Sequence, residues 1–190
     1  MPMIEPLRIP EILEIVPVRH GDERGFFSEV WSAAMLADAG AGREFVQDNH
    51  SLSVETGVLR GLHYQEPPFA QAKLVRVVRG SIFDVAVDIR EGSPTFGQWV
   101  GLTISAEKWN QLLVPEGFAH GFLTLEPNTE VLYKVSAPYS PAHDRGLRWN
   151  DPAIGIDWPL DGRAPILSGK DRAAPLLADI PASFRYPSQA

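Results

Sequence analysis

The sequence predicts an all-β fold, either a sandwich or a barrel of the jelly-roll type. Several short runs alternate apolar and polar residues with a period of two, which is typical of strands. Turn signals rich in glycine and proline separate these runs at short intervals, as in EGSPTFG (91–97), VPEGFAHG (114–121) and LEPNT (125–129). Many short strands punctuated in this way favour a jelly roll over a helical or an α/β fold.

One helix is expected near the start of the chain, over residues 28–39. Ser28 is suited to the N-cap position, Glu29 lies in the first turn, and Gly40 can end the helix. We expect this helix and some N-terminal strands to pack on a barrel core of about residues 45–145.

Three stretches carry the strand pattern most clearly. Residues 74–90 are expected to form two strands joined by a turn at Gly80 and Ser81. In the second strand one face carries Phe83, Val85, Val87 and Ile89, and the other carries Asp84, Asp88 and Arg90. This alternation predicts one buried and one exposed face. Residues 98–105 and 129–136 alternate in the same way, with Val100, Leu102, Ile104, Val131, Tyr133 and Val135 on their apolar faces.

The strand pattern loosens after residue 145. The segment WNDPAIGIDWPLDG (149–162) and the proline-rich end are expected to run as loops and short turns over the barrel. A chain of 190 residues is of ordinary size for one domain. Neither a low-complexity linker nor an internal repeat divides it, so we expect a single domain over residues 1–190.

Composition and charge exclude several classes of protein. Acidic residues outnumber basic ones by 24 to 17, for a net charge of −7, whereas a general nucleic-acid binder carries a basic excess. No apolar run approaches the length of a membrane span, and the N-terminus does not have the pattern of a secretory signal. The chain has no cysteine, which suits a reducing cytoplasm. An anionic small ligand would need positive charge clustered locally at its site.

The stretch RGLHYQ (60–65) places one of the five histidines, His63, in an apolar setting. Three interpretations are open: a core residue with satisfied nitrogens, a metal ligand, or a base. Metal-binding β-barrels usually group histidines as His-x-His beside a carboxylate, but the second of these positions is a glutamine here. A base needs a carboxylate to orient its ring, and LSGKD (167–171) offers Asp171. Taken alone, a core histidine is the best interpretation.

Other polar residues could contribute to a site. His120, in PEGFAHGF, is a second candidate, but two distant histidines are not a metal signature. Tyr133 is expected to point inward, where a tyrosine is usually a core residue, although a phenol in a ligand cavity could instead donate a proton. The basic residues of interest, each a surface residue when taken alone, are Arg24, Arg60, Lys73 and Lys170.

Arg60 and His63 have opposite parity in a regular strand, so their side chains would face opposite sides of the sheet. Gly61 lies between them and can relieve this conflict through a β-bulge. If both side chains reach one pocket, we predict an irregularity in the strand at this glycine.

Taken together, the motifs resemble those of the dTDP-4-dehydrorhamnose 3,5-epimerases, a family of enzymes that act on deoxysugar nucleotides. Each motif alone is moderately specific, and the ordered set is much more so. The similarity covers nearly the whole chain, through GDERGFF (21–27), FVQDNHS (45–51), VLRGLHYQ (58–65), QAKLVRVVRG (71–80), FDVAVDIREGSPTFGQWVG (83–101), VPEGFAHGF (114–122), LYK (132–134), RWNDPAIGIDWP (148–159) and LSGKD (167–171).

The resemblance implies a cupin-like β-barrel that works as a homodimer without a metal or an organic cofactor. The implied substrate is a thymidine-diphosphate (dTDP) 4-keto-6-deoxyhexose. Its C4 ketone acidifies the protons on C3 and C5, so a base can remove one and an acid can return a proton to the other face. Repeated at both carbons, this chemistry takes the D-gluco sugar to the L-rhamno configuration.

The resemblance also implies roles for the residues that could do this chemistry. His63 would be the base, oriented by Asp171 in a His–Asp dyad. Tyr133 would be the acid that returns a proton from the opposite side. Lys73 would stabilise the enolate oxygen, where negative charge develops in the transition state.

A further set of residues would bind the substrate. Arg24, Arg60 and Lys170 would hold the diphosphate or the sugar and supply the local positive charge that an acidic chain needs. Tyr139 would stack on the thymine ring. The sugar and nucleotide sites would be completed by Glu29, Gln47, Asn49, His120 and Asp144.

The chain departs from the family pattern at two places. The family often has two adjacent tyrosines where this chain has Pro138 and Tyr139, and it usually has a glutamate at the position of Asp144. Neither position touches the implied proton chemistry, but both bear on the end of the site that would hold the nucleotide base.

Other functions stay open on the sequence. A relative that inverts only C3 or only C5, for an antibiotic sugar, could keep the same catalytic residues. A non-catalytic cupin that binds sugar nucleotides would keep the basic residues but would need no base and acid pair. A metal-dependent cupin oxygenase would hold bound iron.

Overall fold

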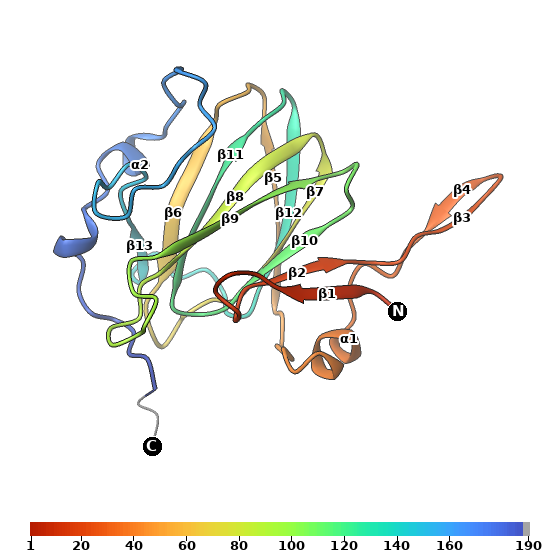
Figure 1. Ribbon diagram of the computed structural model, residues 1–190, viewed down its shortest axis with the longest axis horizontal. Helices are drawn as coiled ribbons and strands as arrows, with labels where there is room; N and C mark the ends of the chain where they lie inside the picture. Colours follow the sequence, from red (N-terminus) through yellow and green to blue (C-terminus); the bar gives the residue numbers. More distant parts are fainter. Residues whose placement is uncertain (188–190) are drawn as a thin grey trace.

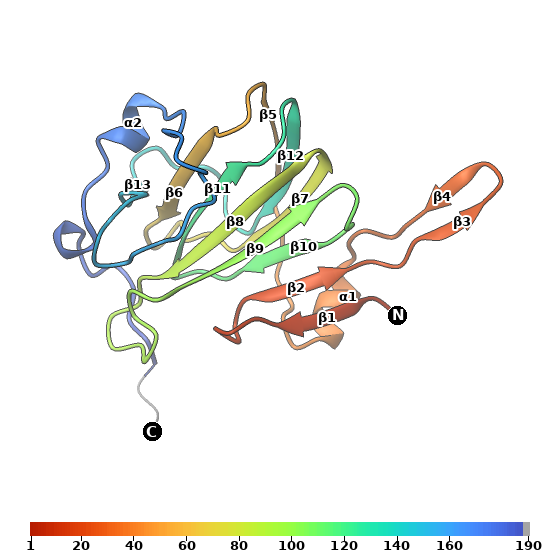
Figure 2. The same ribbon diagram turned by 45° about the horizontal axis from the view of Figure 1, so that its top comes forward.

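Two antiparallel sheets pack face to face in the structure, a computed structural model in which residues 1–187 are described (Figures 1 and 2). The first sheet has the order β1 (Met3–Pro6), β2 (Leu13–Val16), β10 (Gln111–Val114), β7 (Lys73–Arg79), β12 (Thr129–Val135), β5 (Gln47–Ser53). The second has the order β13 (Asp144–Gly146), β6 (Leu59–Gln65), β11 (Phe118–Thr124), β8 (Ser81–Asp88), β9 (Trp99–Ser105). This architecture confirms the predicted all-β, cupin-like jelly roll.

The apolar core lies between the two sheets. It is built from inward-facing side chains of both, among them Val75, Val77, Val131, Ile82, Ala86, Val100 and Phe118. Along β5 and β6, by contrast, the inward positions carry polar side chains such as Asn49 and His63. Strand β5 is at the edge of the first sheet and β6 is next to the edge of the second. The polar part of the barrel interior therefore lies between β5 and β6.

Strands β7 and β8 confirm the turn that the sequence predicts at Gly80, but they lie in different sheets. Gly80 has a φ of +77°, and a Cβ there would lie 2.4 Å from Oγ1 of Thr129. A glycine is therefore needed where the chain crosses from one sheet to the other.

The prediction that β8 has an exposed face is wrong. Asp84 and Asp88, expected at the surface, are both fully buried, because they point into the barrel. The opposite face of the strand, with Val85 and Val87, is covered by side chains of the C-terminal segment such as Trp158. The C-terminal segment, which has little regular structure, therefore buries the face of β8 that carries Val85 and Val87.

The C-terminal segment is mostly loop, as predicted. It contains the short helix α2 (Gly169–Arg172) and a 3-10 turn, η1 (Leu177–Asp179). Figure 1 shows this segment in blue along the outer side of β6. Within residues 1–187, no helix is long and apolar enough to cross a membrane.

Helix α1 (Ala33–Asp38) is shorter than the helix predicted over residues 28–39, and Ser28 is not its N-cap. Ser32 caps the helix instead, by accepting a hydrogen bond from the backbone N–H three residues later. Ser28 accepts a hydrogen bond from an indole N–H and lies outside the helix. Gly40, with a φ of +70°, follows the last turn as predicted.

A two-stranded hairpin, β3 (His20–Asp22) and β4 (Gly25–Phe27), extends away from both sheets (Figures 1 and 2). All six strand residues are exposed, and the side chains of Phe26 and Phe27 are 56% and 72% exposed. The hairpin therefore contributes no apolar core of its own within this chain.

Candidate active site

Strand β6 carries a bulge at Gly61, as the parity of its neighbours predicts. In the pairing with β11, His63 lies opposite His120 and Arg60 opposite Phe122, so two residues of β6 span one of β11. Leu59 and Leu62, three residues apart, pack into the same outer cluster. The residue that follows each of them, Arg60 and His63, consequently faces the barrel.

Only glycine fits at the bulge. Gly61 has a φ of +116°, and a Cβ there would lie 2.6 Å from Cα of Gly121 and 2.7 Å from the carbonyl oxygen of His120. The close approach of β6 and β11 thus depends on two facing glycines, and it sets the orientation of His63.

His63 meets Asp171 as the sequence comparison implies. Nε2 of His63 lies 2.5 Å from Oδ1 of Asp171, which reaches it from α2. The side chain of Asp171 is 5% exposed and that of His63 is 32% exposed, so the carboxylate is buried while the ring is partly accessible. The two residues are far apart in sequence and are brought together by the docking of the C-terminal segment on β6.

Asp171 is held ionised by the groups around it. Burial alone would raise the pKa of this carboxyl, but hydrogen bonds from His63 and Ser168, with the backbone N–H of Gly61, hold the pKa below its usual value. Oγ of Ser168 donates to Oδ2 at 2.8 Å and accepts from the backbone N–H of Asp171 at 3.1 Å. Ser168 is also the N-cap of α2, a role that the spacing Ser-x-x-Asp signals in the sequence.

Lys73 lies beside the dyad on the inner face of β7. Its Nζ is 3.4 Å from the backbone carbonyl oxygen of His63. Burial lowers the pKa of Lys73 to about 8, against the opposing effect of the nearby carboxylates Asp144 and Asp84. The ammonium group is therefore mostly charged at neutral pH, in a place where its charge is poorly solvated.

Tyr133 lies in the same sheet as Lys73 and faces the sheet that carries His63. It lies on β12, opposite Asn49 of β5 and Val75 of β7, and it points inward as predicted. Burial raises the pKa of its phenol, an effect that Arg60 opposes and Asp144 reinforces. The phenol consequently stays protonated at neutral pH.

A second buried histidine–carboxylate pair was not foreseen from the sequence. Nε2 of His120 lies 2.5 Å from Oδ1 of Asp84 on the neighbouring strand, and both side chains are buried. Oδ2 of Asp84 has no hydrogen-bond partner among residues 1–187. The alternation in residues 83–90 places Asp84 on the polar face of its strand, and we expected that face to be exposed. The structure shows that this face points into the barrel.

Hydrogen bonds join several predicted binding residues into two groups that share Tyr139. Oδ2 of Asp144, on β13, accepts hydrogen bonds from Lys170 of α2 and from the hydroxyl of Tyr139 at 3.2 Å. On β5, Nε2 of Gln47 donates to Oδ1 of Asn49 at 2.8 Å, and Oε1 of Gln47 accepts from the backbone N–H of Tyr139 at 3.0 Å.

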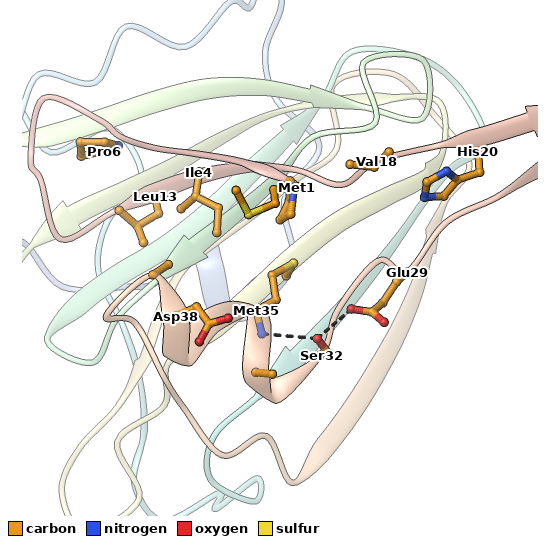
Figure 3. Close-up of a pocket in the computed structure, with 13 residues that line it drawn as sticks. Met1, Ile4, Pro6, Leu13, Val18, His20, Glu29, Ser32, Met35 and Asp38 are labelled. Atoms are coloured by element: carbon orange, nitrogen blue, oxygen red, sulfur yellow. Dashed lines mark hydrogen bonds between the residues drawn. The ribbon is translucent and has the colours of Figure 1, made fainter.

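Arg24 and Glu29 do not join the other predicted residues within this chain. Arg24 lies in the projecting hairpin, paired with Asp22, and its side chain is 84% exposed. Glu29 lines a cavity of about 920 Å³ between α1 and the N-terminal strands, together with Leu13 and Met35 (Figure 3). Its carboxylate accepts a hydrogen bond from Ser32 there. This cavity is lined mainly by apolar side chains and contains none of the four predicted catalytic residues.

Within residues 1–187, no three or more histidine, cysteine, aspartate or glutamate side chains are grouped so that they could hold a metal ion. What the site does offer is a histidine with an ionised partner, a buried ammonium and a protonated phenol. These are the groups that general acid–base chemistry on a carbonyl compound requires.

Comparison with known proteins identifies the family. The sequence model of the family described as dTDP-4-dehydrorhamnose 3,5-epimerase matches residues 6–179. The chain belongs to the dTDP-4-dehydrorhamnose 3,5-epimerase family. A relative of that name from Sinorhizobium fredii is 54% identical over 184 residues, which cover 95% of this chain and 92% of the relative.

Solved structures of related epimerases have the same fold. The dTDP-6-deoxy-D-glucose-3,5-epimerase RmlC from Legionella pneumophila, in complex with dTDP-4-keto-L-rhamnose, superimposes with a TM-score of 0.94 at 47% identity, covering 99% of this chain and 100% of that one. ChmJ, a 3'-monoepimerase from Streptomyces bikiniensis in complex with dTDP-quinovose, gives a TM-score of 0.85 at 38% identity, covering 92% and 87%. The fold alone therefore does not separate epimerases of one centre from those of two.

Proposed function

We propose that this chain is a dTDP-4-dehydrorhamnose 3,5-epimerase, which converts dTDP-4-dehydro-6-deoxy-D-glucose into dTDP-4-dehydro-L-rhamnose. The observation that carries the proposal is the pairing of His63, on β6 of one sheet, with Asp171 of α2, while Tyr133 faces inward from β12 of the other sheet. A base and an acid on opposite walls can remove a proton from one face of the sugar and return one to the other face, which inverts the carbon.

His63 is proposed as the base. Asp171 is an ionised acceptor, so the Nε2 atom that faces it carries the proton, and Nδ1 keeps the lone pair that can accept a proton from C3 or C5. The carboxylate also stabilises the imidazolium that forms when His63 takes this proton.

Lys73 and Tyr133 complete the proposed mechanism. Removal of the proton moves negative charge onto the C4 oxygen, and the buried ammonium of Lys73 stabilises that charge more strongly than it would in water. The raised pKa of Tyr133 keeps its phenol protonated and able to donate to the opposite face. The ketone of the substrate delocalises the charge, so the proposed reaction needs no cofactor.

Arg60 and Lys170 are proposed to hold the diphosphate or the sugar, with His120 lining the sugar site. Tyr139 is proposed to stack on thymine. The other proposed contacts to the nucleotide come from Gln47, Asn49 and Asp144, which lie around Tyr139. Lys170 already pairs with Asp144, so an arriving phosphate would compete with this carboxylate for the ammonium.

Deuterium uptake tests the proposal. The enzyme is incubated with dTDP-4-keto-6-deoxyglucose in heavy water, and C3 and C5 are followed by NMR, with His63→Ala as control. Label at both carbons that is lost in the variant, with an L-rhamno product after reduction of the ketone, supports the 3,5-epimerase. Label and inversion at one carbon would identify a mono-epimerase, and tight nucleotide binding without label would identify a sugar-nucleotide-binding protein.

We further propose that the protein works as a homodimer in which each hairpin reaches the site of the partner. Arg24 and Glu29 lie on or next to a hairpin that projects from its own barrel, and exposed Phe26 and Phe27 give the hairpin an apolar side suited to a protein surface. Light scattering after gel filtration measures the mass. A monomer at micromolar concentration would refute this assembly.

We also propose that residues 1–187 belong to one domain and that the protein works in the cytoplasm. The C-terminal segment supports the first proposal, because it shares the cluster of Leu59, Leu62 and Val85 with the barrel. The absence of cysteine supports the second. Limited proteolysis tests the domain, since a stable fragment that lacks the C-terminal segment would contradict it, and cell fractionation tests the compartment.

A further inference from the structure

Glutamine side chains hold the backbone of the loop that joins β12 to β13. This loop contains Tyr139, and four of its backbone groups in a row bond to glutamine amides. The bonds are Gln71 Nε2 to Ala137 O at 2.8 Å, Gln65 Nε2 to Pro138 O at 3.1 Å, Tyr139 N to Gln47 Oε1 at 3.0 Å, and Ser140 N to Gln65 Oε1 at 2.8 Å. Loop backbone groups more often bond to water or to other backbone groups.

Gln65 is the central member of this set. Its side chain is 3% exposed, and besides its two bonds to the loop it donates to the carbonyl oxygen of Phe69 at 2.7 Å. The amide thus uses two donors and one acceptor at once. A carboxylate of the same shape has no donor, and a carboxylic acid has one. Glutamine is therefore the residue type that satisfies all three backbone groups.

The effect on Tyr139 is to fix its backbone while its ring stays exposed, bonded only through its hydroxyl to Asp144. The bonds of Gln65 bracket this residue in the chain, and Gln47 binds its N–H. The residue as a whole is 58% exposed. A ring presented by an ordered backbone can be contacted by a ligand without the entropic cost of ordering the loop.

We infer that Gln65 is a positioning residue, which keeps the loop of Tyr139 in the shape that receives the nucleotide end of the substrate. This inference rests on the proposed function, in which Tyr139 stacks on thymine. It assigns Gln65 to affinity and not to chemistry, although Gln65 is only two residues from His63 in the same strand. The glutamine that stands where a metal-binding barrel would have its second histidine thereby acquires a role.

The test uses Gln65→Glu, which changes one NH₂ group to oxygen. At least one of the bonds to Phe69 and Pro138 is lost, and the loop is released on that side. We expect the KM for the sugar nucleotide and the Kd for dTDP to rise about tenfold, with kcat changed less than twofold. Gln71→Glu affects one hydrogen bond to the loop, so it should raise the KM and the Kd less than Gln65→Glu does.

Gln111→Glu is the matched control. Gln111 is also 3% exposed and donates to a backbone carbonyl, that of Val30, at 2.7 Å, but it lies outside the loop. Its KM and Kd should match those of the wild type. Amide hydrogen exchange gives a readout that does not depend on activity, and exchange at Ser140 should be at least tenfold faster in Gln65→Glu than in the wild type or the control.

Three outcomes would overturn the inference: unchanged dTDP affinity in Gln65→Glu, a fall in kcat at constant KM, or an equal loss of affinity in Gln111→Glu. Unchanged exchange at Ser140 would also overturn it. If the wild-type protein neither turned over the sugar nucleotide nor bound dTDP, the proposed function would fail instead, and the exchange of Ser140 would still show whether Gln65 orders the loop.

Discussion

Asp171 is a buried carboxylate that hydrogen bonds keep ionised. The carboxylate is almost fully buried, yet it is ionised because His63, Ser168 and a backbone N–H donate to it. An ionised Asp171 fixes the tautomer of His63 that the proposed mechanism requires. The groups around the carboxylate therefore matter to the proposed mechanism as well as the histidine.

Ser168→Ala should weaken the enzyme mainly at low pH. Loss of its hydrogen bond raises the pKa of Asp171, so the dyad is lost at a higher pH as the solution is acidified. The acid limb of the pH profile of kcat/KM should move to higher pH, and loss of the N-cap should lower the free energy of unfolding by about 1 kcal/mol. Ser168→Thr keeps the hydroxyl and should restore the wild-type profile. An acid limb that stays in place would contradict this role.

Lys73→Met should stabilise the fold while it abolishes activity. The folded pKa of about 8 lies below the ordinary 10.5, so the charged side chain destabilises the native state at neutral pH, and its contribution to stability increases as the pH rises from about 8 to 10.5. Removing the ammonium should raise the free energy of unfolding at pH 7 by roughly 2 kcal/mol.

Urea denaturation at pH 7 and pH 10 checks the prediction for Lys73. The gain in stability of Lys73→Met over the wild type should shrink at pH 10, where the lysine is mostly neutral in the native state. A variant less stable than the wild type at pH 7 would show that the ammonium is well compensated in the fold. Turnover should fall at least a hundredfold.

Tyr133→Phe should separate proton removal from inversion. Without the phenol, His63 can still exchange a proton with solvent, but the opposite face loses its donor. Deuterium exchange should stay within about tenfold of the wild type, while inverted product falls by about a hundredfold. Tyr64→Phe is the control, because Tyr64 is buried and its hydroxyl has no partner among residues 1–187. Complete turnover by Tyr133→Phe at the normal rate would refute the acid role.

At the scale of the element, the bulge in β6 is what allows one strand to serve both the core and the site. Leu59, Leu62 and Tyr64 pack outward, whereas Arg60 and His63 face the barrel interior, an order that a regular strand could not give. The bulge requires a glycine in a conformation that other residues rarely adopt, close to the backbone of β11.

Gly61→Ala should therefore damage stability and catalysis together. The methyl group would meet backbone atoms of β11 that cannot move independently, and we expect a loss of about 3 kcal/mol in the free energy of unfolding. Gly155→Ala is a suitable control, because Gly155 also has a positive φ, +64°, but a Cβ there meets nothing within 4 Å. Chemical denaturation and the deuterium assay measure both effects. Equal losses of stability in the two variants would show that the close approach of Gly61 to β11 does not determine the cost of the substitution.

Elements were predictable from the sequence where the local pattern decides their structure. The strands over residues 74–90, 98–105 and 129–136 and the bulge at Gly61 follow from alternation and parity. The start of α1 was misplaced because Ser28 and Ser32 are both suitable caps, and tertiary contacts select the second. The prediction of an exposed face on β8 was wrong because the C-terminal segment packs over this strand. The alternation of apolar and polar residues within a strand does not show whether another segment packs on it.

At the scale of the whole molecule, the proposed dimer leads to a complementation experiment. Arg24→Ala and His63→Ala should each be inactive alone, for different reasons. If hairpins cross between subunits, a mixed dimer contains one site with both residues intact. The two variants are partially unfolded, mixed and refolded together, so that about half of the dimers contain one chain of each. One of the two sites in such a dimer is intact, so up to about a quarter of the wild-type activity should return. No recovery, despite exchange of subunits shown by mass spectrometry, would place Arg24 and His63 of one site in the same chain.

Much of the candidate site was also predictable, but by resemblance more than by pattern. His63 taken alone suits the core, and nothing in the spacing of the chain pairs it with Asp171. The pairing depends on where the C-terminal segment docks, which is a property of the complete fold. The partner of His120 and the loop bonds of Gln65 depend on tertiary proximity, so they became visible only in the structure, whereas the cap at Ser168 has a local signal in the sequence.

The position of Asp171 in the chain has a consequence for synthesis. It lies on the segment that follows β13, the last strand of either sheet. During translation, a barrel can collapse before this segment has left the ribosome. The histidine would then be in place without its carboxylate, and the nascent protein would be inert. Catalytic competence would appear abruptly, when the last part of the chain docks on β6, so incomplete chains would not process the sugar.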